Sequence, residues 1–598
     1  MCGVAGIFAY GSGARAVDDG ELLRMRDAMA ARGPDGAGLW LSGDRQVGLA
    51  HRRLAIIDTT AAGAQPMSTP DGALSIVCNG EIYNYRELRK ELQAKGCRFI
   101  SQSDTEVLLH LYREYGYGMV RRIRGMYAFA LWDAGRRGLL LARDPFGIKP
   151  LYYSDDGNTF RVASQVKALL AGVVDTSPEP AGHVGFFLWG YVPDPYTLYK
   201  GIRALPAGTT LWVDVKGCES PKPFLSLRET LIFAQEQSRF SSAGEMRDEL
   251  RDALLDAVRH HLVADVPVGV FLSSGVDSTT LAFLARECGA EGLRTVTLAF
   301  DEYRGRPEDE APLAEKAAMQ LGARHETRRV GKDVFESEYP RILAAMDQPT
   351  IDGINTYFVS KAAADSGLKV AISGLGGDEL FGGYPSFKEI PVTVRWLKPF
   401  NLLPGMGKAF RFVSAPVLKS CTSPKYAGLL EYGGSYGGAY LLRRGLFMPW
   451  ELPDILDGEL VRKGWEELKI LTMLEESTAG IQSAHMKIAA MEMIWYMRNQ
   501  LLRDSDWASM AHGLEIRVPF VDILLLERMA GSLASSNRPT KHDLAFVPKD
   551  GLTSDVVARQ KTGFGIPVQG WLRERVPSRM ERGYRPWARR LYGEYNSQ

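Results

Sequence analysis

The stretch Phe271-Leu-Ser-Ser-Gly-Val-Asp-Ser278 decides the fold of the second half of this chain. It follows the apolar run Val266-Pro-Val-Gly-Val270 and precedes Thr279-Thr-Leu-Ala-Phe-Leu-Ala285, so it predicts a strand, a tight turn and the start of a helix. Unpaired backbone amides at a helix N-terminus attract anions. The turn lacks the Gly-Lys-Ser/Thr ending of kinase-type phosphate loops. Asp277 would repel a bare phosphate, but a Mg²⁺ ion between this carboxylate and a polyphosphate removes the repulsion.

A second glycine-rich turn, Gly374-Leu-Gly-Gly-Asp-Glu379, follows a predicted strand at 369–373. Between the two turns the chain alternates, with a strand predicted at 293–300 and a helix at 310–321. This alternation predicts an α/β doubly wound parallel sheet, in which both turns meet beyond the carboxyl ends of the strands. Asp378 would then face the aspartate of the first turn, and a shared Mg²⁺ would offset their repulsion.

Composition is typical of a large globular chain. Its 598 residues predict roughly two to four domains, and 45% of them are hydrophobic. The formal net charge of +1 predicts no general attraction to nucleic acid or to an acidic membrane. We see neither an apolar run of transmembrane length nor a signal peptide. The six cysteines form no CxxC pair, which argues against a zinc site or a disulfide framework and predicts a cytoplasmic protein.

The N-terminus carries a candidate nucleophile. Cys2 follows the initiator methionine, and removal of Met1 would leave a free α-amine that can act as a base for the neighbouring thiol. The segments that follow predict a strand-rich α+β sandwich of two sheets between helical layers. Strands are expected at 4–9, 49–58, 76–84, 125–133 and 138–145, and helices at 21–31 and after Ser103.

These segments resemble class II glutamine amidotransferases, which have an N-terminal nucleophile hydrolase fold (αββα). The resemblance implies that Cys2 attacks the side-chain amide of glutamine, forms a thioester and releases ammonia. It also implies that the side-chain amide of Asn79 and the backbone N–H of Gly80 bind the oxyanion, a role that needs two preorganised donors.

The same resemblance assigns the glutamine pocket. Arg53 and Asp104 have the charges needed for the α-carboxylate and the α-amine of glutamine. Glu81 and the backbone from Leu54 to Ile57 would complete the pocket. Two residues depart from the family pattern, because Ala31 stands where many members have His, and Gln165 stands where Glu is usual. Both changes lie near the expected contact with the second domain.

The turn at 271–278 resembles the pyrophosphate-binding loop of ATP pyrophosphatases, and nearly the whole chain resembles the glutamine-hydrolysing asparagine synthetase family. The resemblance implies an ATP site and a Mg²⁺ site at Asp277 and Asp378. The ATP-site residues implied are Leu272, Ser273, Ser274, Gly275, Asp277, Ser278, Leu298, Ser373 and Gly374.

The late run Arg559-Gln-Lys-Thr-Gly-Phe-Gly-Ile-Pro567 also matches a family motif. Its Lys561 would stabilise charge on the α-phosphate while ammonia attacks an acyl-adenylate.

Two further residues depart from the family pattern. Leu375 occupies the place where family members that make asparagine commonly have Glu, which puts the acceptor in question. Trp507 replaces a common Arg, so one positive charge near the expected active site is missing. The pair Glu515 and Arg517 fits a structural role or a functional one. The substrates expected are therefore glutamine, ATP and a carboxylate: aspartate first, or else a sugar acid, a peptide or a natural-product intermediate, which Leu375 and the segment 347–352 motivate.

The expected domains are a glutaminase domain at 2–215, a linker at 216–242 and a synthetase domain at 243–598. We expect no nucleic-acid or membrane partner. A homodimer is a candidate assembly, and the oligomeric state stays open. A third hypothesis, a non-catalytic homologue, is disfavoured because Cys2, Asp277, Asp378 and Lys561 are all retained.

Overall fold

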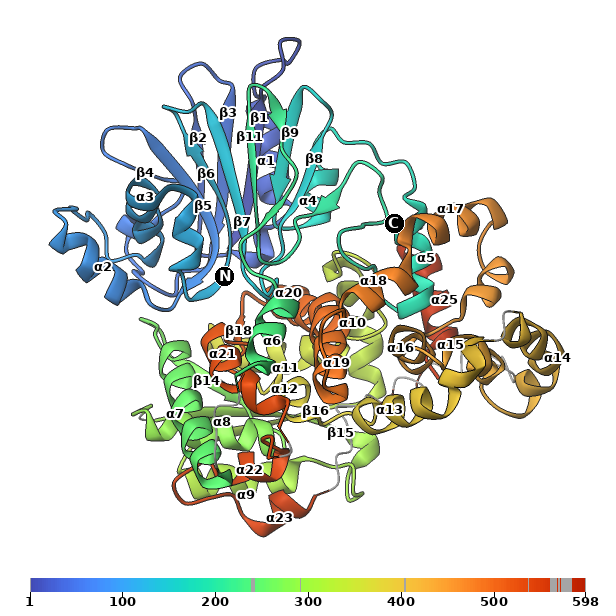
Figure 1. Cartoon of the computed structure of the whole chain (residues 1–598). Helices are drawn as coiled ribbons and strands as arrows, with labels where there is room; N and C mark the ends of the chain where they lie inside the picture. The colour runs from blue at the N-terminus through green and yellow to red at the C-terminus, as the bar shows by residue number, and fades with distance from the viewer. Residues whose placement is uncertain are drawn as a thin grey trace.

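The computed structural model describes residues 2–237, 242–290, 292–402, 405–535, 537–559, 567, 571 and 583–596, without the side chains of residues 401–402 and 419–421. Figure 1 shows an N-terminal β-rich domain above a C-terminal α/β domain, with a lobe of helices beside the second domain. None of the helices in the described part of the chain is long and apolar enough to cross a membrane.

The N-terminal domain stacks two antiparallel sheets (Figure 1). Over the described residues, their strand orders are β10-β8-β9-β1-β3-β2 and β12-β11-β7-β6-β5-β4, with β13 paired to β11. The first sheet contains β1 Gly3–Ala9, β2 Gly36–Leu41, β3 Val47–Arg53, β8 Tyr152–Asp155, β9 Thr159–Ala163 and β10 Arg203–Ala204. The second contains β4 Met67–Ser68, β5 Leu74–Ile82, β6 Gly125–Asp133, β7 Gly138–Arg143, β11 Thr209–Asp214, β12 Gly217–Cys218 and β13 Lys222–Pro223. Apolar side chains such as Phe8 and Val77 fill the space between the sheets.

Helices cover the outer faces of both sheets. α1 (Asp19–Asp27) and α4 (Val166–Leu170) pack on the first sheet, and α3 (Asp104–Tyr115) packs on the second beside α2 (Tyr85–Ala94). The predicted αββα sandwich is therefore confirmed. The helix expected at 21–31 ends earlier, and a 3₁₀ turn follows it.

The C-terminal domain contains a parallel sheet with the order β16-β15-β14-β17-β18 over the described residues. Its strands are β14 Val268–Phe271, β15 Arg294–Phe300, β16 Arg324–Val330, β17 Val370–Ile372 and β18 Glu515–Arg517. The chain runs from β14 outward to β16 and then returns to place β17 on the other side of β14. This reversal creates a crevice at the carboxyl ends of β14 and β17, where such sheets bind ligands. The predicted doubly wound sheet is confirmed.

Helices surround this sheet and form the lobe. Those nearest the sheet are α7 Ala243–His261, α8 Val276–Glu287, α9 Ala311–Leu321, α10 Lys332–Ala345, α11 Ile354–Asp365, α12 Gly377–Phe381, α20 Arg503–Met510, α21 Ile523–Leu533, α22 Lys541–Ala545 and α23 Ser554–Ala558. The lobe and its neighbours comprise α13 Ser386–Leu397, η5 Lys398–Leu402, α14 Met406–Cys421, η6 Pro424–Gly428, α15 Leu429–Tyr432, α16 Tyr436–Arg444, α17 Gly458–Leu468, α18 Ile470–Glu476, α19 Ala484–Met491 and α25 Arg585–Tyr595. One long helix after α19 is π-helical over Glu492–Leu502 (η8) before it continues as α20.

Two helices tie the domains together. α6 (Leu227–Gln235) lies within the predicted linker, and its Leu227 and Leu231 join the apolar core of the second domain. α5 (Pro180–Trp189) of the N-terminal half packs against α17. The domain boundaries given above stay a prediction.

A buried ion cluster joins β18 to the N-terminal domain. Glu515 and Arg517 have no exposed side-chain surface, and Arg517 Nε donates to Glu515 Oε1 at 2.6 Å. Arg517 Nη2 lies 3.3 Å from Glu81 Oε2 on β5, and its Nη1 donates to the carbonyl oxygens of His261 and Val263 at 2.8 and 2.6 Å. The structural interpretation of Glu515 and Arg517 therefore fits their surroundings.

We expect Arg517→Met to destabilise the protein by about 3–5 kcal/mol, because the buried Glu515 carboxylate would lose its cation. Chemical denaturation followed by circular dichroism measures the change. Arg462→Met is the matched control: Arg462 pairs with Glu466 on the exposed surface of α17, where loss of a pair costs about 0–1 kcal/mol. Equal shifts for both variants would contradict the assigned role of Arg517.

Candidate functional site

Cys2 directly precedes β1 of the first sheet and is hydrogen-bonded to β5 of the second sheet. The pairing of Gly3 with Arg52 sets Cys2 beside the end of β3. The thiol is buried, its Sγ lies 4.0 Å from the carbonyl oxygen of Leu54, and burial raises its pKa. A protected thiol at the end of a strand suits a nucleophile that a local base activates.

Asn79 and Gly80 lie opposite this thiol on β5. The Cys2 backbone nitrogen donates to Asn79 Oδ1 at 3.1 Å, which fixes the orientation of the side-chain amide. The Asn79 NH₂ group is buried and has no hydrogen-bond partner among the described residues. Gly80 has φ +155°, and a Cβ there would meet the Met126 carbonyl oxygen at 2.1 Å, so glycine is required. One buried, unsatisfied donor next to the thiol suits an oxyanion site.

The residues expected around glutamine gather at the same edge. Arg53 donates to the carbonyl oxygens of Thr60 (2.7 Å) and Asp58, so its guanidinium is held by the loop that contains Ile57. Asp104 accepts from the Ile82 amide at 2.8 Å, and burial raises the pKa of Asp104 to about 6.

Glu81 is buried beside them, and burial raises its pKa well above the ordinary value. The three predicted side chains thus contribute one guanidinium and two carboxyl groups, and Arg517 of the second domain lies 3.3 Å from Glu81.

Arg32 connects the nucleophile to the second domain. Its Nε donates to the Cys2 carbonyl oxygen at 3.1 Å, and its Nη1 and Nη2 donate to the two oxygens of Asp506 at 2.6 and 3.0 Å. Both side chains are almost fully buried. Asp347 makes a second connection, because its carboxylate accepts from the backbone N–H groups of Val166 and Lys167 at 2.9 and 3.1 Å, at the start of α4. Sequence reasoning missed both links, although it noted the segments that carry them.

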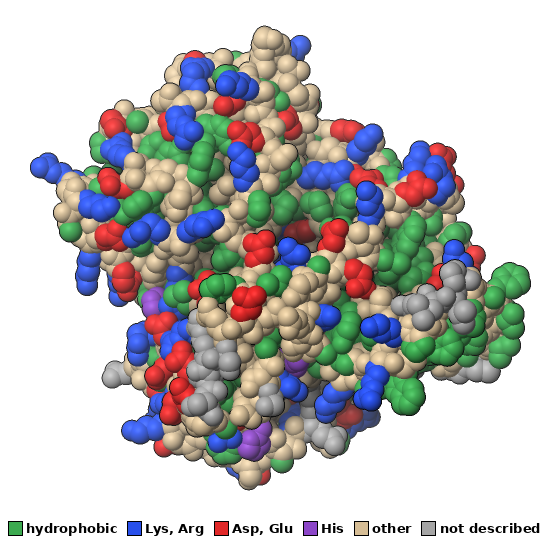
Figure 2. All heavy atoms as spheres, in the orientation of Figure 1, with side chains coloured by type: hydrophobic (Ala, Val, Ile, Leu, Met, Phe, Trp, Pro, Cys, Tyr) green, Lys and Arg blue, Asp and Glu red, His purple; other side chains and the backbone are tan. Residues whose placement is uncertain are grey.

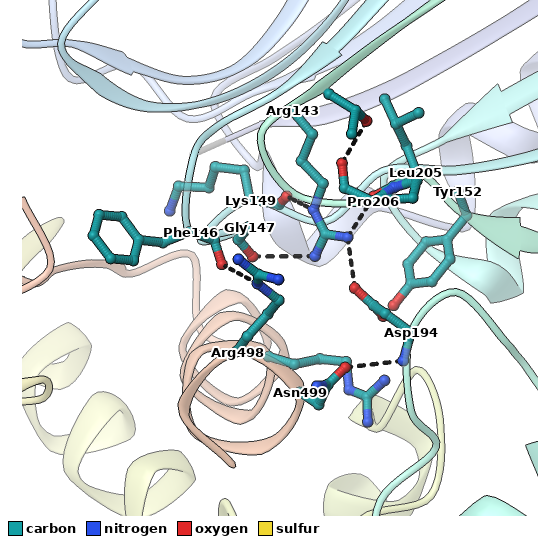
Figure 3. A network of polar contacts seen from close by, with 12 residues as sticks. Arg143, Phe146, Gly147, Lys149, Tyr152, Asp194, Leu205, Pro206, Arg498 and Asn499 are labelled. Atoms are coloured by element: carbon teal, nitrogen blue, oxygen red, sulfur yellow. Dashed lines mark hydrogen bonds and ion pairs between the residues drawn. The ribbon is translucent and has the colours of Figure 1, made fainter. Parts of the chain in front are cut away.

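A third network joins the loop after β7 to η8 (Figure 3). Arg143 donates to Asp194 at 2.8 Å and to the carbonyl oxygens of Lys149 and Leu205 at 2.9 and 2.7 Å. From the second domain, Arg498 donates to the carbonyl oxygen of Phe146 at 3.1 Å. The networks together hold the two domains in a fixed relation.

The second candidate site is a cleft of about 1010 Å³ at the carboxyl ends of β14 and β17. Every residue expected to bind ATP lines it. The two glycine-rich turns touch: a Cβ on Gly377 would meet Asp277 Cγ at 2.8 Å, so the close approach needs glycine. Ser278 Oγ accepts from the Ser273 amide at 3.1 Å and shapes the first turn.

Lys541 was not anticipated from the sequence. Its ammonium group lies between the two expected metal ligands, in contact with both oxygens of Asp277 and 3.0 Å from Asp378 Oδ1. Burial opposes the charge, but the two carboxylates hold the pKa of Lys541 above its ordinary value. A lone lysine at the start of α22, 264 residues from Asp277, gives no local signal. The expected repulsion between the carboxylates is therefore offset by a side chain of the protein.

Two oxygen ligands close enough to share one cation also suit Mg²⁺, which takes one or two carboxylates and completes its shell with water and phosphate. Arg559, at the start of the late motif, contacts Ser274 Oγ and lines the cleft. Lys561 lies outside the described residues.

The far wall of the cleft carries charges that the sequence did not bring together. Burial and the neighbouring Asp352 raise the pKa of Asp504 to about 8, and Trp507 Nε1 donates to Asp504 Oδ1 at 2.9 Å. Burial lowers the pKa of Lys425 to about 8. Leu375 lines the same cleft.

Comparison with known proteins identifies the family. A glutamine amidotransferase domain model matches residues 1–225, and an asparagine synthase model matches residues 249–595. Asparagine synthetase [glutamine-hydrolyzing] 1 of Bacillus subtilis is 32% identical over 584 residues, which cover 96% of this chain and 88% of that protein. The chain belongs to the glutamine-hydrolysing asparagine synthetase family. This family member is thus a ligase that joins a glutamine amidotransferase to an ATP-dependent synthetase.

The chain is also similar to two proteins that are not named as asparagine synthetases. The amidase chry2 of Gibberella zeae is 32% identical over 619 residues, covering 96% of this chain and 90% of that protein. A solved glutamine phosphoribosylpyrophosphate amidotransferase of Bacillus subtilis aligns at 17% identity with a TM-score of 0.29, over 65% of this chain and 78% of that one. The latter similarity is too low to add to the argument.

In this asparagine synthetase family member, we expect Lys541→Met to lower ATP-dependent amide synthesis about 100-fold or more and to leave glutamine hydrolysis unchanged. Without the ammonium group, Asp277 and Asp378 repel each other and one of them takes up a proton. The assays are amide formation with ammonia as nitrogen donor and glutamate release from glutamine. Lys316→Met, which removes an exposed pair with Asp555, is the control. Synthesis at the wild-type rate in Lys541→Met would refute this role.

Proposed function

We propose that this enzyme converts aspartate to asparagine, using glutamine as nitrogen donor and ATP with Mg²⁺ to activate the carboxylate. The observation that carries the proposal is the cleft at the carboxyl ends of β14 and β17. Two glycine-rich turns, the Asp277–Asp378 pair and further acidic and basic side chains line this one space. The buried Cys2 in the other domain supplies the second half of the reaction.

Cys2 would attack the amide carbon of glutamine after its thiol loses a proton to the α-amine that removal of Met1 exposes. The Asn79 NH₂ group, which is unsatisfied in the protein alone, and the Gly80 N–H would donate to the oxyanion. Arg53 and Asp104 would bind the α-carboxylate and the α-ammonium of the substrate. Ammonia is released, and water then frees glutamate from the thioester.

ATP would lie with its base against the apolar wall made by Leu272 and Leu298. Its phosphates would meet the amides and hydroxyls of Ser273, Ser274, Gly275 and Ser278, at the N-terminus of α8. The Asp277 and Asp378 carboxylates fit the oxygen ligands that Mg²⁺ prefers, and the ion would supply charge neutralisation to the phosphates. Ser373 and Gly374 would contact the nucleotide, and Lys561 would stabilise charge at the α-phosphate.

The acceptor would be held by opposite charges in the same cleft. Asp352 and Asp504 are two neighbouring carboxyl groups whose pKa values are raised by burial, and a substrate ammonium would offset their mutual repulsion. Lys425 has no ion-pair partner among the described residues and would bind a carboxylate. An amino acid with a second carboxylate, such as aspartate, matches this set. Ammonia would pass between the sites inside the protein, since bulk water would protonate it.

A second candidate keeps both half-reactions and changes the acceptor to a sugar acid, a peptide carboxylate or a natural-product intermediate. Leu375 favours it, because this side chain offers no carboxylate to an acceptor. The substrates in either case are small molecules. We further propose a cytoplasmic enzyme, which fits the five free cysteines of the described residues, and a homodimer, which a measurement of mass in solution would test.

A panel of carboxylates tests the acceptor. Each is incubated with ATP, Mg²⁺ and ammonia, and pyrophosphate release is measured. We expect aspartate to give the largest signal, with asparagine as product. Absence of aspartate-dependent pyrophosphate, together with a signal from another carboxylate, would replace aspartate by that acceptor.

Two variants test the division of labour. Cys2→Ala should abolish glutamine-dependent synthesis and leave ammonia-dependent synthesis intact, because only the glutaminase loses its nucleophile. Asp277→Asn should abolish synthesis and keep glutamine hydrolysis. Loss of both activities in both variants would contradict two separate sites.

We expect kcat/KM for glutamine to fall as the pH drops through about 6, because the Asp104 carboxylate takes up a proton in the free enzyme near that value. Above this pH the carboxylate is charged and can bind the substrate ammonium. His51 does not explain such an inflection, since burial lowers its pKa to about 3. Asp104→Asn should have a low kcat/KM without the inflection near pH 6. An unchanged pH profile in that variant would refute the assignment.

A further inference from the structure

α14 of the helical lobe presents its apolar face to solvent. Ala409, Phe412, Val413, Pro416 and Val417 recur at the helical spacing that normally faces a core, yet all five are exposed. Phe412 is 84% and Val413 is 75% exposed, so neither side chain is packed in a core of the described residues. In Figure 2, green hydrophobic side chains gather over this lobe at the right edge of the molecule.

The preceding α13 and η5 add a second exposed row. Val392, Trp396 and Phe400 follow one another at intervals of four residues, and Trp396 is 73% exposed. We name the exposed apolar residues of these two rows the lobe patch: Val392, Trp396, Phe400, Ala409, Phe412, Val413, Pro416 and Val417. Patches of large apolar side chains on a soluble protein mark interaction surfaces.

The charge around the lobe patch is strongly positive. Residues 386–428 contain seven lysines and arginines and one glutamate, a formal charge of +6, whereas the whole chain carries +1. Glu389 is paired with Arg443, and Arg411 is paired with Glu431. Lys388, Arg395, Lys398 and Lys408 are exposed and have no ion-pair partner among the described residues.

The exposed apolar side chains and the positive charge together indicate what kind of partner binds the lobe patch. A second copy docked symmetrically on the lobe patch would bring two segments of charge +6 together, which is unfavourable. An anionic lipid surface satisfies both features, because aromatic and aliphatic side chains enter the headgroup region while lysines and arginines meet lipid phosphates. α14 has 16 residues and Lys408 and Arg411 within it, so it lies on such a surface and does not cross it.

We propose that the lobe patch is a peripheral docking surface for anionic lipid membranes. The lobe patch adjoins the synthetase cleft, because α14 packs against η6, whose Lys425 lines the cleft. Docking therefore brings one wall of the cleft close to the membrane. The proposal is independent of the acceptor assigned above. It departs from the expectation of no membrane partner, which rests on a net charge that averages over the whole chain.

Co-sedimentation with lipid vesicles tests the proposal. The full chain is mixed with phosphatidylcholine vesicles that contain either no charged lipid or about 30% phosphatidylglycerol. We expect at least about tenfold stronger binding to the anionic vesicles, and weaker binding as salt rises from about 0.05 M to about 0.5 M. The double variant Phe412→Glu/Val413→Glu should lower binding about tenfold or more and keep glutamine hydrolysis.

A matched control carries the same change elsewhere. Phe233→Glu/Val173→Glu replaces residues that are 63% and 65% exposed outside the lobe, and it should bind vesicles like the wild type. If Phe412→Glu/Val413→Glu fails to fold, a second variant tests whether the exposed lysines and arginines are needed for binding to the anionic vesicles. This variant is Lys388→Glu/Arg395→Glu/Lys398→Glu/Lys408→Glu. Absence of binding to either vesicle, or equal binding to both, overturns the proposal. So does sedimentation velocity showing a dimer that only the Phe412→Glu/Val413→Glu variant dissociates, because a second copy then covers the patch.

Discussion

A single buried guanidinium, that of Arg32, governs how the two halves of this molecule fit together. A charge removed from water is tolerated only when its hydrogen-bonding capacity is met inside the protein. Arg32 meets it with the Cys2 carbonyl oxygen on one side and both oxygens of Asp506 on the other. The strand end that carries the nucleophile is therefore tied to α20 through one buried side chain. The position of the thiol is set as much by the synthetase domain as by its own sheet.

The other contacts between the domains follow the same rule. Arg517 is satisfied by Glu515, by Glu81 and by two backbone carbonyl oxygens, and Asp347 supplies the missing acceptor to the start of α4. Such groups must be paired before water leaves the interface, so they tolerate few relative arrangements of the domains. A fixed arrangement of the domains is needed when ammonia is made at one site and consumed at another. A loose interface would expose the intermediate to water, where it gains a proton and ceases to be a nucleophile.

Local patterns predicted much of this fold, and long-range charge pairing accounts for what they missed. Local signals predicted the strands at 125–133 and 138–145 and the two glycine-rich turns. These signals are the spacing of apolar residues and the presence of glycines, and both act over a few residues. Lys541 reaches Asp277 across 264 residues, and Arg32 reaches Asp506 across 474, so no local pattern announces either pair. Trp507 is instructive because the sequence suggested only a lost positive charge. The structure has a buried indole whose N–H stabilises Asp504, which explains how the site tolerates the change.

The net charge of this chain does not show how its charges are distributed over the surface. The value of +1 is the difference between 72 lysines and arginines and 71 aspartates and glutamates, and it counts buried pairs such as Arg32 with Asp506 and Arg517 with Glu515. Those pairs shape the interior and have no influence on what approaches from outside. The field that a partner meets comes from exposed, uncompensated groups, and four such cations, Lys388, Arg395, Lys398 and Lys408, lie on the lobe of α13 and α14. A neutral chain can therefore have a strongly basic face, because folding decides which charges pair and which remain at the surface.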